Sequence, residues 1–297
     1  MTLPEHARYT WGGDEFLLVE ITPDMSLESN FIANAMALGL ETAALDGIVD
    51  ICPANASLLV RFDPDALDHG VLEARLREIE SEVRKATVQQ LDTRIVEMPV
   101  WYADPYTREV EERFREGFHQ RPEGTDLDYS AEVNGLASAE EFIRRHHETP
   151  WIVSMVGFVA GLPFLFQLTP RERQLEVPKY LSPRTDTPAL TIGYGGCFTA
   201  HYSVRGAGGY QMLGITPTPI FDPEQRLADF ADFMVLFRTG DIVKYRPVDE
   251  AEYREIEAQV AAGTYRYKQA KVTFTLADAL ADPDAYNRTL LEALDVA

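Results

Sequence analysis

The chain has 297 residues, 45% of them hydrophobic, and a formal net charge of −21. This length allows two domains or one large one. The strong negative charge argues against binding to nucleic acids or anionic membrane surfaces, because both require a basic surface. No apolar run is long enough to span a membrane and the start lacks the features of a secretory signal, so we expect a cytoplasmic protein.

Hydrophobic periodicity predicts alternating strands and helices at the start of the chain. Strands are expected at residues 15–21, 57–62 and 93–100, and helices at 27–45 and 63–88. This order is typical of a small α/β sandwich of the split βαβ kind.

The middle of the chain is predicted to be helical and then to form strands. A helix is expected at 106–118, and the polar segment 119–129, which contains Pro and Gly, is expected to be a surface loop. Residues 138–141 have a capping-box pattern ahead of a helix at 142–147. A strand is expected at 151–158.

The rest of the chain up to residue 248 is rich in β-formers and turns, which is typical of a barrel or sandwich. Its one helical pattern is at 224–233. Beyond it we expect a helix at 250–262, a strand at 265–275 and a helical tail at 276–294. The sequence therefore predicts an α+β protein.

Residues 177–214 are dense in glycine and proline, which excludes a helix and predicts short strands joined by tight turns. Basic and phenolic side chains lie on these turns. An ordinary rim of a β-barrel is the competing interpretation of this segment.

Several common motifs are absent from the sequence. The chain has no Gly-Lys dipeptide for a P-loop, no Met-Lys dipeptide for biotin attachment, and no G-x-S-x-G elbow. Its glycine clusters do not open a helix after a strand, which argues against a dinucleotide fold. Two cysteines, Cys52 and Cys197, are too few for a disulfide framework, and neither they nor His146 and His147 have the spacing of metal ligands.

Several segments resemble known protein families. The stretches VPKYLSPRTDTPALTIGYGG, GAGGYQMLGITPTPIFD and VNGLASAEEF, with the tail 248–274, resemble the carboxyltransferase domain of urea carboxylase. The segment from His146 through Trp151 to GFVAGLPFL is similar to the 5-oxoprolinase subunit known as allophanate hydrolase subunit 1. GGDEFLLVEI and ANASLLVRFDP fit as well, so the resemblance covers nearly the whole chain.

The resemblance implies two parts, a small N-terminal α/β domain and a C-terminal cyclophilin-like β-barrel. Together with the predicted elements, we expect four segments. These are an N-terminal α/β domain (1–105), a helical connector (106–148), a cyclophilin-like β-barrel domain (149–249) and a helix-strand-helix tail (250–297). It also implies a sister subunit of related barrel fold that shares the active site.

The resemblance further implies a carboxyltransferase subunit of a biotin-dependent, ATP-driven carboxylase that acts on a urea- or amide-like nitrogen. A partner carrier supplies carboxybiotin and a partner subunit uses ATP. One alternative is the corresponding subunit of an ATP-dependent 5-oxoprolinase, which opens a lactam. A second alternative is a non-catalytic regulator of a sensor histidine kinase.

Candidate catalytic residues follow from the family pattern P-K-Y-x-x-x-R-T. Arg184 is expected to bind a carboxylate, and Lys179 to polarise an oxygen, although both also suit structural ion pairs. His146 is a candidate general base or a helix-end residue. Tyr202 is a candidate in the glycine-rich loop, as a hydrogen-bonding group or as a buried tyrosine.

Substrate contacts are expected from the residues that surround the catalytic candidates, to hold a planar amide or the biotin ring. The expected contacts are Tyr180, His201, Gly208, Gly209, Tyr210 and Gln211. We expect no metal.

Four positions depart from the family patterns. Ala160 and Ala207 replace prolines, Ile215 replaces an arginine, and His201 replaces an apolar residue. The last two changes suggest an acceptor other than urea, such as a larger or less polar amide or lactam.

Overall fold

The computed structural model describes residues 3–86 and 89–297, and the chain divides into two compact units. The first unit extends to residue 91 and includes 274–280, and the second contains 92–273 and 281–297. The division into four segments remains a prediction. Within the described residues, none of the helices is sufficiently long and apolar to cross a bilayer.

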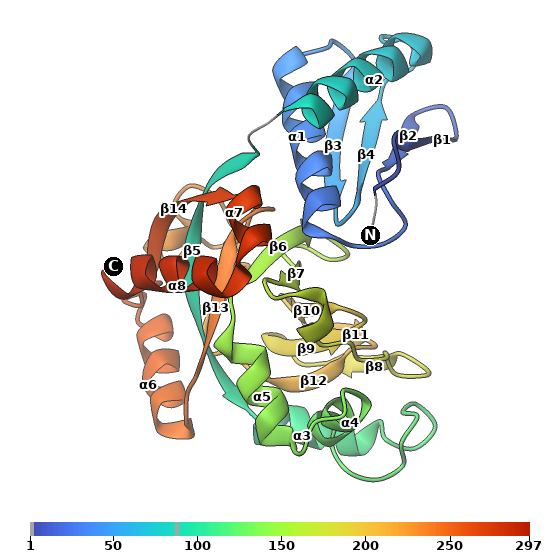
Figure 1. Ribbon diagram of the computed structural model, residues 1–297. Coiled ribbons are helices and arrows are strands. Elements are labelled where there is room, and N and C mark those ends of the chain that lie inside the picture. Colours follow the sequence, from blue (N-terminus) through green and yellow to red (C-terminus); the bar gives the residue numbers. More distant parts are fainter. Residues whose placement is uncertain (1–2, 87–88) are drawn as a thin grey trace. The chain divides into compact units, whose positions relative to one another are not determined.

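The first unit is an antiparallel sheet with two helices packed on it (Figure 1). Buried residues alternate along its central strands, Leu17 and Val19 in β2 and Leu58 and Val60 in β4, and share one core with both helices. The strand order is β1-β2-β4-β3. The elements are β1 (Arg8–Gly12), β2 (Phe16–Glu20), α1 (Leu27–Ala43), β3 (Ile48–Ala54), β4 (Ser57–Phe62) and α2 (His69–Lys85).

This unit departs from the predicted βαβαβ order. The strand expected at 93–100 belongs to the second unit, while β1 and β3 were not predicted. The helix expected from residue 63 begins at His69, because the carbonyl of Asp63 accepts turn hydrogen bonds and Asp68 is the N-cap. Its expected end at Val88 lies outside the described residues.

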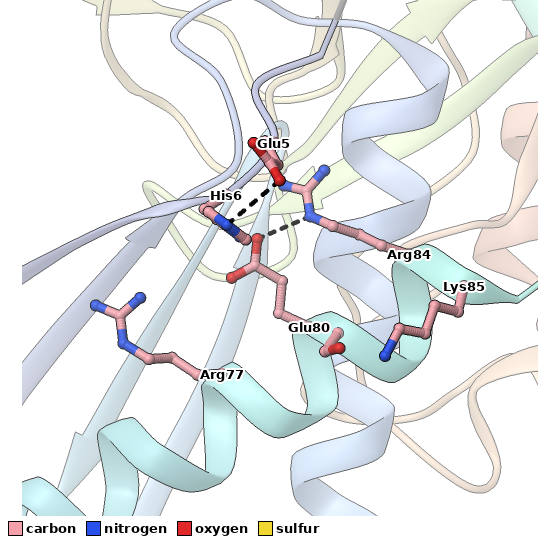
Figure 2. A pocket seen from close by; sticks show the side chains of 7 residues that line it. Glu5, His6, Arg77, Glu80, Arg84 and Lys85 are labelled. Carbon is pink, nitrogen blue, oxygen red and sulfur yellow. Dashed lines mark hydrogen bonds and ion pairs between the residues drawn. The ribbon is translucent and has the colours of Figure 1, made fainter.

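A buried carboxylate ties the N-terminal segment to α2. Glu80 is 3% exposed, and its oxygens accept hydrogen bonds from the Ala7 amide (2.7 Å), the Tyr9 hydroxyl (3.0 Å) and Arg84 Nε (2.8 Å). A hollow of about 360 Å³ lies beside it. The side chains that line it, shown in Figure 2, are those of Glu5, His6, Arg77, Glu80, Ser81, Arg84 and Lys85. None of the predicted site residues lies there.

The second unit is built on a sheet with the strand order β12-β9-β10-β7-β6-β13-β5-β14. β12 also pairs with β5, so the strands from β12 through β5 form a closed ring of paired strands. A separate pair, β8 (Arg184–Thr187) and β11 (Gly206–Gly208), lies outside this sheet. The other strands are β5 (Gln90–Tyr102), β6 (Trp151–Val156), β7 (Pro163–Gln167), β9 (Thr191–Gly195), β10 (Phe198–His201), β12 (Gln211–Ile215), β13 (Ile242–Pro247) and β14 (Gln269–Thr275).

Helices of this unit agree with the predictions near residues 106–118, 142–147 and 250–262. They are α3 (Pro105–Arg113), α5 (Ala139–Glu148) and α6 (Glu250–Ala261). The predicted tail is broken into α7 (Leu276–Ala281), most of which belongs to the first unit, and α8 (Pro283–Asp295), because Asp282 caps a new helix whose first residue is proline.

Two predictions in this unit are wrong. The expected surface loop 119–129 contains the start of α4 (Asp126–Val133), where Thr125 and Asp128 form a capping box. The helical pattern at 224–233 forms only a short 3₁₀ turn at Ala228–Phe230.

Closure of the sheet requires a glycine at position 214. A Cβ there would lie 2.4 Å from the Trp101 carbonyl oxygen and 2.8 Å from Tyr102 Cα, both backbone atoms of β5. Because backbone cannot swing aside as a side chain can, β12 approaches β5 only if residue 214 has no side chain.

We predict that Gly214→Ala lowers the free energy of unfolding by about 1–3 kcal/mol, the usual cost of overpacking. Gly206→Ala is the matched control, since a Cβ at Gly206 would meet nothing within 4 Å. Urea denaturation of both variants measures the difference. Equal stabilities would mean that the pairing of β12 with β5 does not depend on the missing side chain.

Candidate functional site

Most of the predicted site residues gather around the β8–β11 pair. The Tyr180 amide donates to the Gly209 carbonyl (2.8 Å), and the Arg184 guanidinium carbon lies 4.4 Å from the centre of the Tyr180 ring. Lys179 Nζ lies 5.2 Å from the centre of the Tyr210 ring. The structure therefore brings these residues together from both ends of segment 177–214.

Arg184 is the buried cation of this cluster. The residue is 0% exposed, and its Nη2 donates to Thr187 Oγ1 at 3.3 Å. Its Nε and Nη1 atoms have no hydrogen-bond partner in the part of the chain that the structure describes. A buried guanidinium with unmatched donors is costly, and a planar carboxylate is the ligand that best matches its geometry.

Gly208 allows the Tyr202 hydroxyl to approach this arginine. A Cβ at Gly208 would lie 2.4 Å from Tyr202 Oη and 2.7 Å from Thr187 Oγ1. Burial raises the pKa of Tyr202, while the positive charge of Arg184 acts in the opposite direction. The hydroxyl therefore remains protonated beside the guanidinium at neutral pH.

Tyr210 closes another side of the cluster. Its ring occupies the space above Gly195, where a Cβ would lie 2.4 Å from Tyr210 Cδ1. Lys179, which is exposed, extends over the same ring, so its ammonium group remains in contact with solvent.

Asp126 fixes Tyr180 beneath Arg184. This carboxylate is 0% exposed and accepts hydrogen bonds from the Tyr180 hydroxyl (2.7 and 2.8 Å), the Met212 amide (2.8 Å) and Arg115 Nη2 (2.9 Å). Burial, together with the negative charge of Asp126, raises the pKa of Tyr180. The Tyr180 ring is therefore held in place by a carboxylate of α4 on one side and a guanidinium of β8 on the other.

Both ends of the Gln211 side chain are already engaged. Its Nε2 donates to the Pro178 carbonyl (2.8 Å), and its Oε1 lies 2.8 Å from His119 Nε2. Burial lowers the pKa of His119, which favours a neutral ring that donates to Gln211. In this arrangement Gln211 holds the segment that carries Lys179.

His146 and His201 form a second group inside the closed sheet. His146 Nδ1 lies 2.8 Å from the Tyr102 hydroxyl and its Nε2 lies 3.1 Å from Thr199 Oγ1. His201 Nε2 lies 2.6 Å from the Tyr245 hydroxyl, and the Tyr245 ring stacks on His146 at 4.7 Å. Burial lowers the pKa of His146 well below its usual range and that of His201 to about 3.

The alternation of side chains along a strand separates the two groups. His201 and Tyr202 are consecutive in an extended segment, so their side chains point to opposite faces of the sheet. His201 points to the interior and Tyr202 to the Arg184 cluster. Among the described residues, no hydrogen bond or ring contact joins either histidine side chain to that cluster.

Four residues near the cluster were not predicted from the sequence, namely Glu111, Arg115, His119 and Asp126. Glu111 and Arg115 lie in the predicted helix 106–118, whereas His119 and Asp126 lie in the polar segment 119–129, whose Pro and Gly indicated a surface loop. The Thr125-x-x-Asp128 capping pattern was the available signal for a helix start there. No group of three or more His, Cys, Asp or Glu suited to a metal ion occurs in residues 3–86 and 89–297.

Glu111 is the buried acid next to Asp126. It is 4% exposed, its Oε2 accepts from the Asp126 amide at 3.2 Å, and Arg115 Nη2 lies 3.5 Å from it. Burial, together with the charge of Asp126, raises the pKa of Glu111 to about 9. Glu111 is therefore neutral at physiological pH, and the ion pair with Arg115 is made by Asp126.

Comparison with known proteins gives one family match and several relatives. A model of the family described as "Carboxyltransferase domain, subdomain C and D" matches residues 7–230. A 5-oxoprolinase subunit of Bacillus subtilis is 30% identical over 249 residues, which is 81% of this chain and 92% of that protein.

Larger proteins also match. The urea amidolyase of Saccharomyces cerevisiae is 25% identical over 269 residues, which is 90% of this chain but only 14% of that protein. The crystal structure of the K. lactis urea amidolyase superposes with a TM-score of 0.85 at 23% identity, over 99% of this chain and 18% of that chain. The latter similarity shows a shared fold.

We predict that Glu111→Gln changes how stability depends on pH. The folded-state pKa of Glu111 is raised to about 9, against about 4.3 in an unfolded chain. Its contribution to stability is therefore lost progressively as pH rises between these two values. Relative to the wild type, the variant should gain thermal stability from about pH 5 to about pH 9. If the stability of the wild type and that of Glu111→Gln change with pH in the same way, the proton is not held by Glu111.

We predict that Asp126→Asn lowers the free energy of unfolding by about 3–5 kcal/mol, because it leaves Arg115 buried without its counter-charge. Asp186→Asn is the control, since Asp186 pairs with the exposed Arg113 and Arg205, and such surface pairs contribute about 0–1 kcal/mol. Urea denaturation of both variants tests this. If Asp126→Asn lowers the free energy of unfolding no more than Asp186→Asn does, Asp126 does not hold these segments together.

Proposed function

The chain belongs to the carboxyltransferase domain family, subdomains C and D, and we propose that it is one half of a carboxyltransferase active site. The enzyme is a biotin-dependent, ATP-driven carboxylase that acts on a urea- or amide-like nitrogen. The observation that carries this proposal is the buried Arg184, whose unmatched donors lie within the family segment.

The relatives support this function. The match to the yeast urea amidolyase extends over 90% of the chain, and the match to the Bacillus subtilis 5-oxoprolinase subunit over 81%. This chain spans only 14% of the yeast urea amidolyase, and its sequence contains neither the Gly-Lys dipeptide of a P-loop nor the Met-Lys dipeptide of a biotin carrier. We therefore propose a sister subunit of related fold, and a biotin carboxylase or carrier subunit that uses ATP.

Arg184 is proposed to bind the carboxylate that is transferred. Its Nε and Nη1 have no partner among the described residues, so each can donate a hydrogen bond to a carboxylate, and the Tyr180 ring supports the flat face of the guanidinium. Since Arg184 is fully buried, a ligand reaches it only after a local rearrangement of the residues that cover it.

Lys179 is proposed to polarise an oxygen of the reacting group. Its ammonium group lies at the exposed side of the Tyr210 ring, and its backbone carbonyl accepts from Gln120 Nε2 at 3.0 Å. A positive charge at this place stabilises negative charge that develops on an oxygen as the carboxyl group leaves.

Biotin, when bound, supplies the carboxyl group for transfer. The residues present fit a flat polar ring, because Tyr210 offers an aromatic wall and the Tyr202 hydroxyl lies next to the side-chain-free Gly208. Tyr180 and Gly209 are joined by a backbone hydrogen bond, and Gly209 and Gln211 flank Tyr210 in the chain.

We propose that His146 and His201 hold neighbouring strands and side chains in place inside the sheet. Both ring nitrogens of His146 have partners inside the sheet, so its role as a general base remains a prediction that this geometry does not favour. His201, through Tyr245, joins strands β10 and β13. Substrate contact by His201 also remains a prediction.

The acceptor is proposed to be larger or less polar than urea. Ile215 takes the place of a family arginine, and here it packs with Val248, Tyr253 and Ile256 in an apolar cluster. This position therefore offers no contact for a carboxylate or a urea oxygen.

The proposed enzyme is cytoplasmic, and the closed sheet of the second unit is its cyclophilin-like β-barrel. The pairing of β12 with β5 supports a barrel, since it leaves no open edge between these strands.

A second candidate function is that of a subunit in an ATP-dependent 5-oxoprolinase, in which the same site helps to open a lactam. The higher identity, 30% over 92% of the Bacillus subtilis protein, favours this alternative. Regulation of a sensor histidine kinase is the third alternative, and it requires no catalytic site.

A pull-down of the tagged chain from its own cells, probed with streptavidin, distinguishes these functions. We expect a biotinylated protein that remains bound. A stable sister subunit without any biotinylated protein would favour the oxoprolinase, and the absence of any stable partner would favour the regulator.

We predict that Arg184→Lys lowers kcat/KM of the assembled enzyme by about tenfold to hundredfold, because lysine keeps the charge but loses the paired donors. Arg205→Lys is the control, since Arg205 is an exposed partner of Asp186. Steady-state kinetics with the carboxyl donor varied tests this. Activities within twofold of each other would place the carboxylate elsewhere.

A further inference from the structure

A hollow of about 250 Å³ lies between α3 and the segment that leads into α4, within the second unit. Its position is separate from the Arg184 cluster, and no predicted site residue lines it. The lining residues are Arg108, Glu111, Glu112, Arg115, Pro122, Gly124 and Thr125.

The two arginines of this hollow have unused capacity to bind anions. The side chain of Arg115 is 10% exposed, and its Nη1 has no hydrogen-bond partner in the described parts of the chain. Arg108 forms no ion pair within 4.0 Å with any described residue. A nearly buried guanidinium nitrogen without an acceptor is a costly arrangement that a bound oxyanion would relieve.

The acidic residues of the wall leave this positive charge largely available. Glu111 is neutral near physiological pH, because burial and the charge of Asp126 raise its pKa to about 9. As a neutral acid it can donate a hydrogen bond. Asp126 balances Arg115 through Nη2, and Glu112 is exposed to solvent.

We propose that this hollow binds a small oxyanion through Arg108 and the free Nη1 of Arg115, with the carboxyl group of Glu111 beside them. The shared chemistry is that of a phosphate, a sulfate or a carboxylate. This site does not depend on the proposed carboxyltransferase function.

Binding in this hollow is coupled to the Arg184 cluster. Arg115 Nη2 donates to Asp126 at 2.9 Å, and Asp126 holds the Tyr180 hydroxyl at 2.7 Å, beneath Arg184. An oxyanion on Nη1 fixes the guanidinium in the orientation that supports Asp126. A ligand at Arg184 therefore binds more tightly when the hollow is filled, and the reverse also holds by linkage.

Isothermal titration of the full chain with sulfate, near neutral pH and at low salt, tests the site. We expect saturable binding at one site per chain, and a loss of affinity of about tenfold or more in Arg108→Ala. Arg144→Ala is the matched control, since Arg144 is an exposed arginine of α5 paired with Glu148. Parallel titrations with phosphate and acetate distinguish a tetrahedral anion from a carboxylate.

A pH series adds a second readout. Sulfate keeps the same charge across the range, while Glu111 ionises near pH 9 and adds a negative charge among Arg108, Arg115, Asp126 and Glu112. The affinity of the wild type for sulfate should therefore fall as the pH rises toward 9 and beyond. The affinity of Glu111→Gln for sulfate should not change over the same pH values.

Three results would overturn the proposal. The first is the absence of saturable binding, and the second is equal affinity in Arg108→Ala and Arg144→Ala. The third is a loss of binding in Arg184→Met with retention in Arg108→Ala, because the anion would then occupy the Arg184 cluster. This last result would leave the proposed function intact.

Discussion

The buried carboxylate of Asp126 is the interaction on which the candidate site depends. It accepts hydrogen bonds from Arg115, which follows α3, from the Tyr180 hydroxyl and from the Met212 amide of β12. These three partners come from distant parts of the sequence. One charge therefore fixes the helical segment, the P-K-Y segment and a strand of the closed sheet together, and it does so where water cannot screen it.

The arrangement of charge around Asp126 explains why Arg184 remains unmatched. Asp126 already balances Arg115, and Glu111 next to it is neutral because its pKa is raised to about 9. Tyr180 stands between Asp126 and Arg184, so the arginine has no carboxylate of its own within the described residues. This combination holds a guanidinium rigidly and leaves donors for a ligand, which is the preorganisation that recognition of a carboxylate needs.

The sequence predicted the strands of 177–214 and the helices near 106–118 and 250–262, because glycine, proline and apolar periodicity are local signals. The grouping of Lys179, Arg184 and Tyr202 came from a family pattern. The role of Asp126 was not predictable, because its partners are 11 to 86 residues away along the chain. The placement of His146 and His201 inside the sheet depends on strand register, which the pattern of residues alone does not fix.

We propose that this chain forms one half of a carboxyltransferase active site in a biotin-dependent carboxylase. The most direct measurement incubates the native complex with ATP, labelled bicarbonate and a panel of amides and lactams, with and without avidin. We expect label on an amide-type nitrogen of one acceptor, and its loss when avidin binds the biotin. Lactam opening that consumes ATP, needs no bicarbonate and is unaffected by avidin would contradict it.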